Sequence, residues 1–202
     1  MTEYLASLDA LHALYGTPAM AATVKVTRHL IPTYAAFIAR ARFAILTTVG
    51  PEGTDASPRG DDGPVVRILD PQRLALPDWR GNDRIDALRN IMRDGRVSLM
   101  FMIPGVNNVI RVNGRARLTA DADVLASFAR DGKIPRTVAM ITIDEVYSQC
   151  ARALIRSGLW TVGDQSAGVP TVGDMLRDVT QGDYDGAAYD DAWPARAASS
   201  MW

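Results

Sequence analysis

Six short runs rich in apolar and β-branched residues follow one another between residues 42 and 150, and this order constrains the fold more than any other feature. Runs of this length and composition are typical of β-strands. Helix-like segments do not alternate with them, so a parallel β–α–β sheet is not expected. The pattern predicts a small antiparallel barrel or sandwich with helical additions, a mainly β fold of the α+β class. The predicted strands are 42–49, 65–70, 73–78, 96–103, 108–119 and 137–150.

Helical patterns gather at the two ends of the chain, where apolar residues recur at spacings of three and four. We interpret the chain as a single domain, 1–202, with N-terminal helices in 1–41, a barrel core in 42–160 and a helical extension in 161–202. The last ten residues are expected to be mobile. Predicted helices are 3–14, 32–41, 121–131, 151–160, 172–179 and 183–192, with one more between Gly81–Asn82 and Asp94.

Three prolines and four glycines in residues 50–64 predict a loop or a turn between strands. No run of about 20 apolar residues is present, so no membrane span is expected. The acidic, amphipathic N-terminus does not resemble a secretory signal. The single cysteine, Cys150, excludes an intramolecular disulfide, and we interpret it as a small buried hydrophobe of a cytoplasmic protein.

The net charge of −1 argues against general nucleic-acid binding, but the charge is unevenly spread. Residues 41–120 hold 12 Arg and Lys against 9 Asp and Glu, whereas residues 121–202 hold 7 against 12. A small anionic ligand is therefore expected at the basic middle of the chain. A solvated surface rich in arginine is the alternative.

The commonest catalytic sets are missing from the sequence. The only histidines, His12 and His29, lie far in sequence from Cys150, which argues against a Cys/His or Ser/His hydrolase and against a structural zinc site. No nucleotide-binding glycine motif of the Walker or Rossmann type occurs. Redox chemistry in this chain would require a borrowed cofactor.

The segment LPDWRGNDRIDALRNI, residues 76–91, places cations where a helix is expected to begin. Arg80 and Arg84 lie near the positive end of the helix dipole, where a cation is disfavoured by up to about 1 kcal/mol. Asp83 and Asp86 relieve part of this repulsion, and a bound anion would relieve the rest. Simple ion pairs on an exposed helix are the alternative.

Two longer stretches resemble a known family. They are SPRGDDGPVVRILD…LALPDWRGNDRIDALRNIMRDGRVSLMFMIPGVNNVIRVNGRARLT and, further on, EVYSQCARALIRSGLW. In their order they resemble the FMN-binding split-barrel superfamily, the pyridoxamine 5′-phosphate oxidase-like proteins, and within it the branch of probable FMN-dependent enzymes. The resemblance covers residues 40–160, most of the chain.

The resemblance implies a homodimeric split antiparallel β-barrel of the FMN-binding type, with FMN in a cleft between subunits and a small molecule as substrate. Arginines and helix-end amides would grip the phosphate, and a strand edge would flank the flavin ring. The C-terminal element of the family would approach the flavin. The implied cofactor-binding residues are Val66, Arg67, Ile68, Leu69, Asn82, Arg84, Leu88, Arg89, Arg152, Arg156, Ser157 and Trp160.

Several of these residues have plainer interpretations. Arg67 alternates with apolar neighbours and could face solvent, and Trp160 could anchor the core or an interface. The apolar positions Ile85, Leu88, Ile91 and Met92 are interpreted as core packing.

The sequence also departs from its relatives. Ala87 stands where they often carry serine, and Arg152 stands where they often carry lysine. No histidine follows residue 29, whereas true pyridoxamine-phosphate oxidases hold their substrate with a C-terminal Arg-x-His segment, so the vitamin-salvage reaction is not expected. The leading hypothesis is an FMN-dependent oxidoreductase. A non-catalytic FMN carrier or flavin sensor, a split barrel using deazaflavin or haem, and a structural dimer with a decayed cleft remain alternatives.

Overall fold

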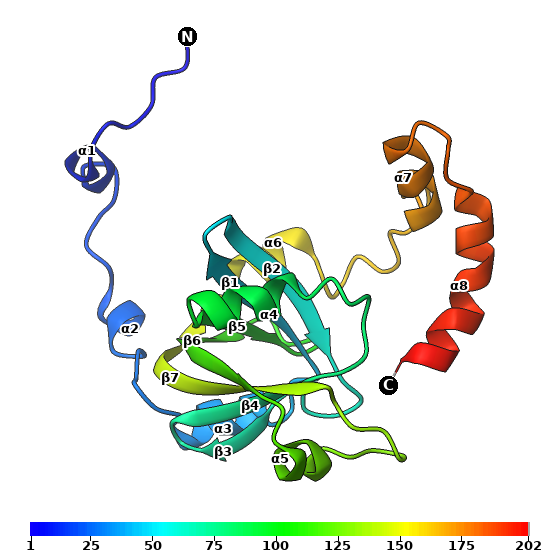
Figure 1. The fold of residues 1–202 in the computed structure, drawn as a ribbon. Coiled ribbons are helices and arrows are strands. Elements are labelled where there is room, and N and C mark those ends of the chain that lie inside the picture. The colour runs from blue at the N-terminus through cyan, green and yellow to red at the C-terminus, as the bar shows by residue number, and fades with distance from the viewer. Residues whose placement is uncertain (202) are drawn as a thin grey trace.

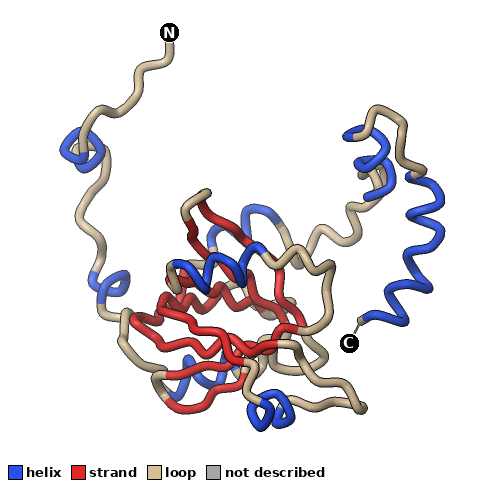
Figure 2. The backbone as a smooth tube through the Cα atoms, in the orientation of Figure 1, coloured by secondary structure: helices blue, strands red, loops and turns tan. Residues whose placement is uncertain are grey.

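The computed structural model describes residues 1–201, and its centre is one antiparallel sheet of seven strands that curls into a barrel (Figure 1). The strand order is β2-β1-β5-β6-β7-β4-β3, and every neighbouring pair is antiparallel. Figure 2 shows that the strands form the compact centre and that helices and loops surround them. The strands are β1 Phe43–Gly50, β2 Gly53–Gly60, β3 Arg67–Asp70, β4 Arg73–Asp78, β5 Arg96–Met102, β6 Val109–Thr119 and β7 Thr137–Gln149.

The helices lie outside this sheet, at the two chain ends or in its connections (Figure 2). α4 links β4 to β5 and packs against β1, whereas α5 links β6 to β7. The six predicted strands are confirmed within three residues at each end. The helices are α1 Leu8–His12, α2 Met20–Thr23, α3 Pro32–Ile38, α4 Asp86–Arg93, α5 Ala122–Ser127, α6 Arg152–Ser157, α7 Val172–Val179 and α8 Gly186–Ser200.

The barrel core follows the alternation of the strands, because every second side chain points inward. Leu46, Leu99 and Val112 are fully buried, and Ile38 of α3 closes the core from one side. A β-bulge at Asn113/Gly114 shifts the register between β6 and β7. A Cβ at Gly114 would lie 2.1 Å from the carbonyl oxygen of Thr142, so this close approach of two backbones requires glycine.

The prediction of a loop over residues 50–64 was wrong, because β2 occupies Gly53–Gly60 and pairs with β1 along its whole length. Its inward positions, Asp55, Ser57 and Arg59, are polar and half-buried. A strand with no apolar alternation gives no periodic signal in the sequence. The same polar positions make β2 one wall of the cavity described below.

Helix α4 begins later than predicted, because Ile85 adopts a left-handed backbone conformation (φ 51°) and the first helical residue is Asp86. The buried face of α4 consists of Ala87, Asn90 and Ile91, and the Asn90 side-chain amide donates a 3.1 Å hydrogen bond to Thr48 Oγ1. The predicted core stripe was therefore wrong except at Ile91, which is buried. Leu88 is half-buried, and both Ile85 and Met92 are exposed.

The N-terminal segment and α7 stand away from the barrel, on either side of the face that carries α4 (Figure 1), whereas Met201 beyond α8 lines a cavity with Trp79 and Arg80. The N-terminal segment contains only the short helices α1 and α2, without a buried residue, in place of the predicted helix 3–14. The apolar residues that recur along this segment have no surface to pack against among the described residues. At the other end, α7 and α8 pack on each other as a hairpin.

The C-terminal hairpin is well formed. α7 spans the predicted residues 172–179, and its N-terminus has a capping box of Thr171 and Asp174. α8 begins later than predicted and continues to Ser200, so the final described residues are mostly helical, while their mobility stays a prediction. The helix continues past Pro194 in a segment rich in alanine, the residue with the highest helix propensity. Likewise, the helix predicted over 121–131 is limited to Ala122–Ser127.

Candidate functional site

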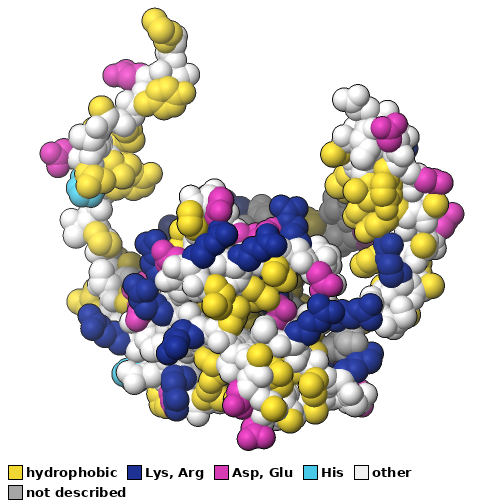
Figure 3. Space-filling view, viewed as in Figure 1, with side chains coloured by type: hydrophobic (Ala, Val, Ile, Leu, Met, Phe, Trp, Pro, Cys, Tyr) yellow, Lys and Arg dark blue, Asp and Glu magenta, His cyan; other side chains and the backbone are white. Residues whose placement is uncertain are grey.

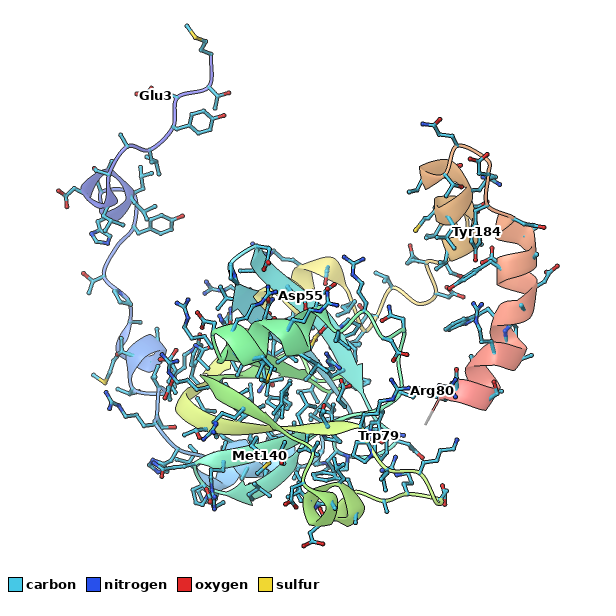
Figure 4. The ribbon with its side chains drawn as sticks, in the orientation of Figure 1. Glu3, Asp55, Trp79, Arg80, Met140 and Tyr184 are labelled. Carbon is cyan, nitrogen blue, oxygen red and sulfur yellow. The ribbon has the colours of Figure 1, made fainter. Side chains whose placement is uncertain are left out.

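A cavity of about 390 Å³ opens where β2, the end of β4, the start of β7 and the N-terminus of α4 meet. In Figure 4, Asp55 lies beside α4 at one end of this region, while Trp79 and Arg80 lie together at the other. Four arginines and four aspartates line it, so the lining is strongly charged but has no net charge. These are Arg59, Arg80, Arg84, Arg136, Asp55, Asp78, Asp83 and Asp86.

Two buried polar atoms on the wall of this cavity lack a hydrogen-bond partner. Arg59 Nη1 pairs with Asp78 Oδ1 at 2.6 Å, and both side chains are about four-fifths buried. Arg59 Nε, however, has no acceptor among the described residues, and Thr137 Oγ1 has no partner either. A buried polar atom left unpaired costs about 1–3 kcal/mol. Two such atoms on one wall therefore indicate a place where a ligand with acceptor oxygens would be stabilised.

At the entrance to α4, the arginines already have carboxylate partners. Arg84 pairs with Asp86, and this hydrogen bond raises the pKa of the Arg84 guanidinium. Arg136 Nη1 lies 2.7 Å from Asp83 Oδ1. Both pairs are more than one-third exposed, so they are weak and can exchange partners. The role of Arg84 in holding an anion therefore stays a prediction.

A second cavity, of about 300 Å³, shares Trp79 with the first and lies between β3 and the segment after α5. Arg67 is fixed at its rim, because its guanidinium donates to Ser127 Oγ at 2.9 Å and to the Ser127 carbonyl at 2.8 Å. The same group lies over the Phe128 ring, 3.8 Å from the centroid. The nearly buried carboxylate of Asp61 accepts a hydrogen bond from Trp79 Nε1 at 2.9 Å and pairs with Arg130.

The structure brings together some of the predicted site residues. Asn82, Arg84 and Leu88 line the first cavity, where the Asn82 side chain accepts a hydrogen bond from the backbone N–H of Arg84. Val66 and Arg67 line the second cavity. The other two residues of that strand, Ile68 and Leu69, lie outside its lining, Ile68 against the core and Leu69 exposed.

The remaining predicted residues lie elsewhere. Arg89 is exposed on α4, outside the lining of the first cavity, and the α6 residues Arg152, Arg156 and Ser157 are exposed as well. Trp160 Nε1 donates to the Val106 carbonyl at 3.0 Å, so this residue anchors α6 to the β5–β6 connection. Cys150 is exposed, which corrects the prediction of a buried cysteine, because it follows the last residue of β7.

Sequence reasoning missed the most informative side chains of the first cavity. Arg59 lies inside the SPRG stretch, but the surrounding segment was interpreted as a loop. Thr137 was assigned only to a strand. The one signal in the sequence that could have indicated the cavity was Arg59, a charged residue at an inward position of a polar strand.

The fold defines the class of protein: it is an antiparallel split barrel, with a charged cavity beside a short helix. The pyridoxamine 5′-phosphate oxidase family matches residues 30–150, more than half of the chain, and the chain belongs to that family. The match includes all seven strands together with α3, α4 and α5. The fold class and the family expected from the sequence are thus confirmed.

Similar solved structures have low sequence identity to this chain. One is a protein from Lactobacillus delbrueckii described as a candidate pyridoxamine 5′-phosphate oxidase, with 23% identity and a TM-score of 0.49, covering 60% of this chain and 95% of that one. A variant of HupZ from Group A Streptococcus has 17% identity and a TM-score of 0.48, covering 59% and 98%. An FMN-binding protein from Syntrophomonas wolfei has 13% identity and a TM-score of 0.43, covering 57% and 80%. None of the curated proteins compared matches the chain.

Among residues 1–201, no helix has both the length and the apolar character needed to cross a bilayer.

Proposed function

We propose that this protein is a homodimeric flavoprotein that binds FMN without a covalent link and acts as an oxidoreductase on a small molecule. The observation that carries the proposal is the pair of unpartnered buried atoms, Arg59 Nε and Thr137 Oγ1, on one wall of the first cavity. Together with the arginines at the entrance to α4, they provide donors for the oxygens of a phosphate group. Membership of the pyridoxamine 5′-phosphate oxidase family supports a phosphorylated cofactor of this kind.

The residues of the first cavity fit the phosphate end of FMN. Arg59 and Thr137 would donate to its oxygens from the barrel wall, and Asn82 and Arg84 would do so from the loop before α4. Leu88 and Arg89 would extend the binding surface along that helix.

Trp79 and the strand Val66–Leu69 would border the flavin ring in the direction of the second cavity, because Trp79 lines both cavities. Bound FMN would supply hydride or electron transfer at N5 of its ring. Arg67 would bring a fixed positive charge to the rim, since Ser127 and Phe128 hold its guanidinium in place.

The helix α6 would act in the partner's site. Arg152, Arg156 and Ser157 are exposed and lie outside the lining of both cavities of their own chain. Trp160 ties this helix to the β5–β6 connection, so it has a fixed position from which to reach a second subunit.

A second candidate function, a non-catalytic FMN carrier or sensor, is favoured by one observation. The carboxylates of Asp61, Asp78, Asp83 and Asp86 all accept hydrogen bonds from arginine or tryptophan. Groups paired in this way are poor general acids or bases. Asp55 of the first cavity lies outside this set, so turnover would depend on the cofactor, its electron donor and that one carboxylate.

The deciding experiment is a titration of the purified full-length protein with FMN, riboflavin, the deazaflavin F420 and haem, followed by absorbance and flavin fluorescence. We expect FMN to bind with a micromolar or lower Kd and to bind more tightly than riboflavin. Failure to bind FMN would overturn the proposal. Tight binding of F420 or haem in place of FMN would show that the protein uses that cofactor instead. Reduction of the bound flavin by NADH or NADPH, coupled to turnover of an acceptor, would distinguish an enzyme from a carrier.

A further inference from the structure

The second cavity, between β3 and the segment after α5, carries one more positive than negative charge. Its lining includes two arginines, Arg67 and Arg130, and one carboxylate, Asp61. Both oxygens of this nearly buried carboxylate are already in use, because Trp79 Nε1 donates to one and Arg130 pairs with the other. Arg67 has no carboxylate partner among residues 1–201, and its hydrogen bonds both go to Ser127. The positive charge in excess is therefore that of Arg67.

The carboxylates that follow or precede the lining residues in sequence do not offset this charge. Asp62 pairs with Arg42, Asp78 pairs with Arg59 at 2.6 Å, and Asp131 is exposed and lies outside the lining. In Figure 3, basic and acidic side chains are interspersed over the barrel, so no field of a single sign covers this face. An anion would therefore be held by contacts inside the cavity and not by the surface around it.

Arg67 is held in place by its own chain. Its guanidinium donates to Ser127 Oγ at 2.9 Å and to the Ser127 carbonyl at 2.8 Å, and it lies 3.8 Å from the centroid of the Phe128 ring. A guanidinium has five N–H donors, of which these bonds use two. Further donors are thus available for a carboxylate, the anion that arginine binds in a bidentate geometry. Because the side chain is already ordered, binding costs little additional side-chain entropy.

The other walls of the second cavity are apolar and partly aromatic. Val66 and Pro77 are buried, whereas Trp79 and Phe128 are half-buried. The hydrogen bond from Trp79 Nε1 to Asp61 Oδ2, at 2.9 Å, fixes the orientation of the indole ring. A flat ring packs well against walls of this kind. Ligand pockets commonly have volumes of roughly 300–1,000 Å³, so a cavity of about 300 Å³ suits a molecule of one or two rings.

We propose that the second cavity is the substrate site and that it takes a small aromatic carboxylate. The carboxylate binds Arg67 at the rim, and the ring lies against Trp79 and Phe128. Asp61 holds Trp79 and pairs with Arg130, which leaves Arg67 as the cation for the ligand. Naming this ligand the substrate rests on the flavoprotein proposed above, since Trp79 lines both cavities and brings the second one next to the flavin ring.

Isothermal titration calorimetry of the full-length protein tests the site, with benzoate, benzamide and cyclohexanecarboxylate as probes. Benzamide keeps the ring without the charge, and cyclohexanecarboxylate keeps the charge without the flat ring. We expect benzoate to bind with a Kd below about 1 mM and both other probes to bind roughly 10-fold more weakly. The titrations use protein without FMN and protein saturated with FMN. Benzoate is expected to bind both forms and to shift the visible spectrum of the bound flavin.

Two variants separate the charge from the ring. Arg67→Gln should weaken benzoate binding by roughly 10-fold or more and leave benzamide binding unchanged. Arg73→Gln is the matched control, because Arg73 is exposed on the neighbouring strand and lines neither cavity. Phe128→Leu keeps an apolar side chain and should lower the preference for benzoate over cyclohexanecarboxylate. Circular dichroism checks that each variant is folded, and if Arg67→Gln is not, Phe128→Leu and the wild-type probe series decide.

Equal binding of benzoate and benzamide by the wild type, or an unchanged benzoate affinity in folded Arg67→Gln, would overturn the inference. Displacement of FMN by benzoate would overturn it too, because the second cavity would then belong to the cofactor. A protein that binds FMN but not benzoate would overturn the inference and leave the proposed function intact. A protein that binds benzoate through Arg67 but does not bind FMN would overturn the proposed function and support the binding site.

Discussion

Arg59 offers a direct test of the proposed phosphate site, because one of its nitrogen atoms is paired and another is not. Nη1 holds Asp78 at 2.6 Å, while Nε is buried without an acceptor. Arg59→Lys keeps a cation near Asp78 but removes the second, fixed donor of the guanidinium. Loss of one charge-assisted hydrogen bond to phosphate is worth about 1.5–3 kcal/mol. We therefore expect the Kd for FMN to rise by roughly 10- to 150-fold.

The assay is quenching of flavin fluorescence, with FMN and riboflavin titrated side by side. Riboflavin lacks the phosphate, so its Kd should change little in Arg59→Lys, and the preference for FMN should fall. Arg73→Lys is the matched control, since Arg73 forms an exposed pair with Asp70 outside both cavities. An unchanged Kd for FMN, or an equal loss of affinity for both flavins, would refute the placement of the phosphate beside Arg59.

Three further changes test other parts of the structure. Arg84→Ala should weaken FMN binding by about 1.5–3 kcal/mol with an unchanged melting temperature, because 79% of the side chain is exposed; an unchanged Kd would place the phosphate elsewhere. A hydrogen bond from Arg96 lowers the pKa of Asp94 from 3.8 to about 2, so its stabilising contribution is present above pH 4 and lost toward pH 2. Denaturation curves of wild type and Asp94→Asn should therefore differ at pH 6 and converge near pH 2, and a constant difference would contradict this. Gly114→Ala should destabilise the barrel by about 1–3 kcal/mol in urea unfolding, because the new Cβ would meet a β7 carbonyl oxygen; equal stability would show that the bulge can widen.

Most of the barrel could be predicted from the sequence because its strands carry their own signal. Runs such as 96–103 and 137–150 are long, apolar and β-branched, and they were located within two residues. Likewise, α7 has Thr171 and Asp174 at the spacing of a capping box. β2 was missed for the opposite reason, since its inward side chains are polar and serve a cavity rather than the core.

The site was less predictable, because its geometry depends on segments far apart in the chain. The wall that leaves two atoms unpartnered joins Arg59, Asp78 and Thr137, from three different strands, and no local pattern relates them. The sequence did predict that Asn82 and Arg84 lie together at the start of a helix, and both line the cavity there. The alternative drawn from the sequence, an ion pair on an exposed helix, is also seen, because Arg84 pairs with Asp86 across the left-handed turn at Ile85.

The balance of four arginines and four aspartates around the cavity still permits an anion, because the ion pairs differ in burial. The Arg84–Asp86 and Arg136–Asp83 pairs are largely exposed, and pairs of this kind contribute about 0–1 kcal/mol each. A phosphate dianion can therefore draw both guanidinium groups away from their carboxylates at low cost. Arg59 remains with Asp78, because its departure would leave the Asp78 carboxylate, about four-fifths buried, without its ion-pair partner. In the proposed complex the cavity would thus combine one fixed cation, Arg59, which would orient the phosphate, with two exposed cations, Arg84 and Arg136, which would pair with it.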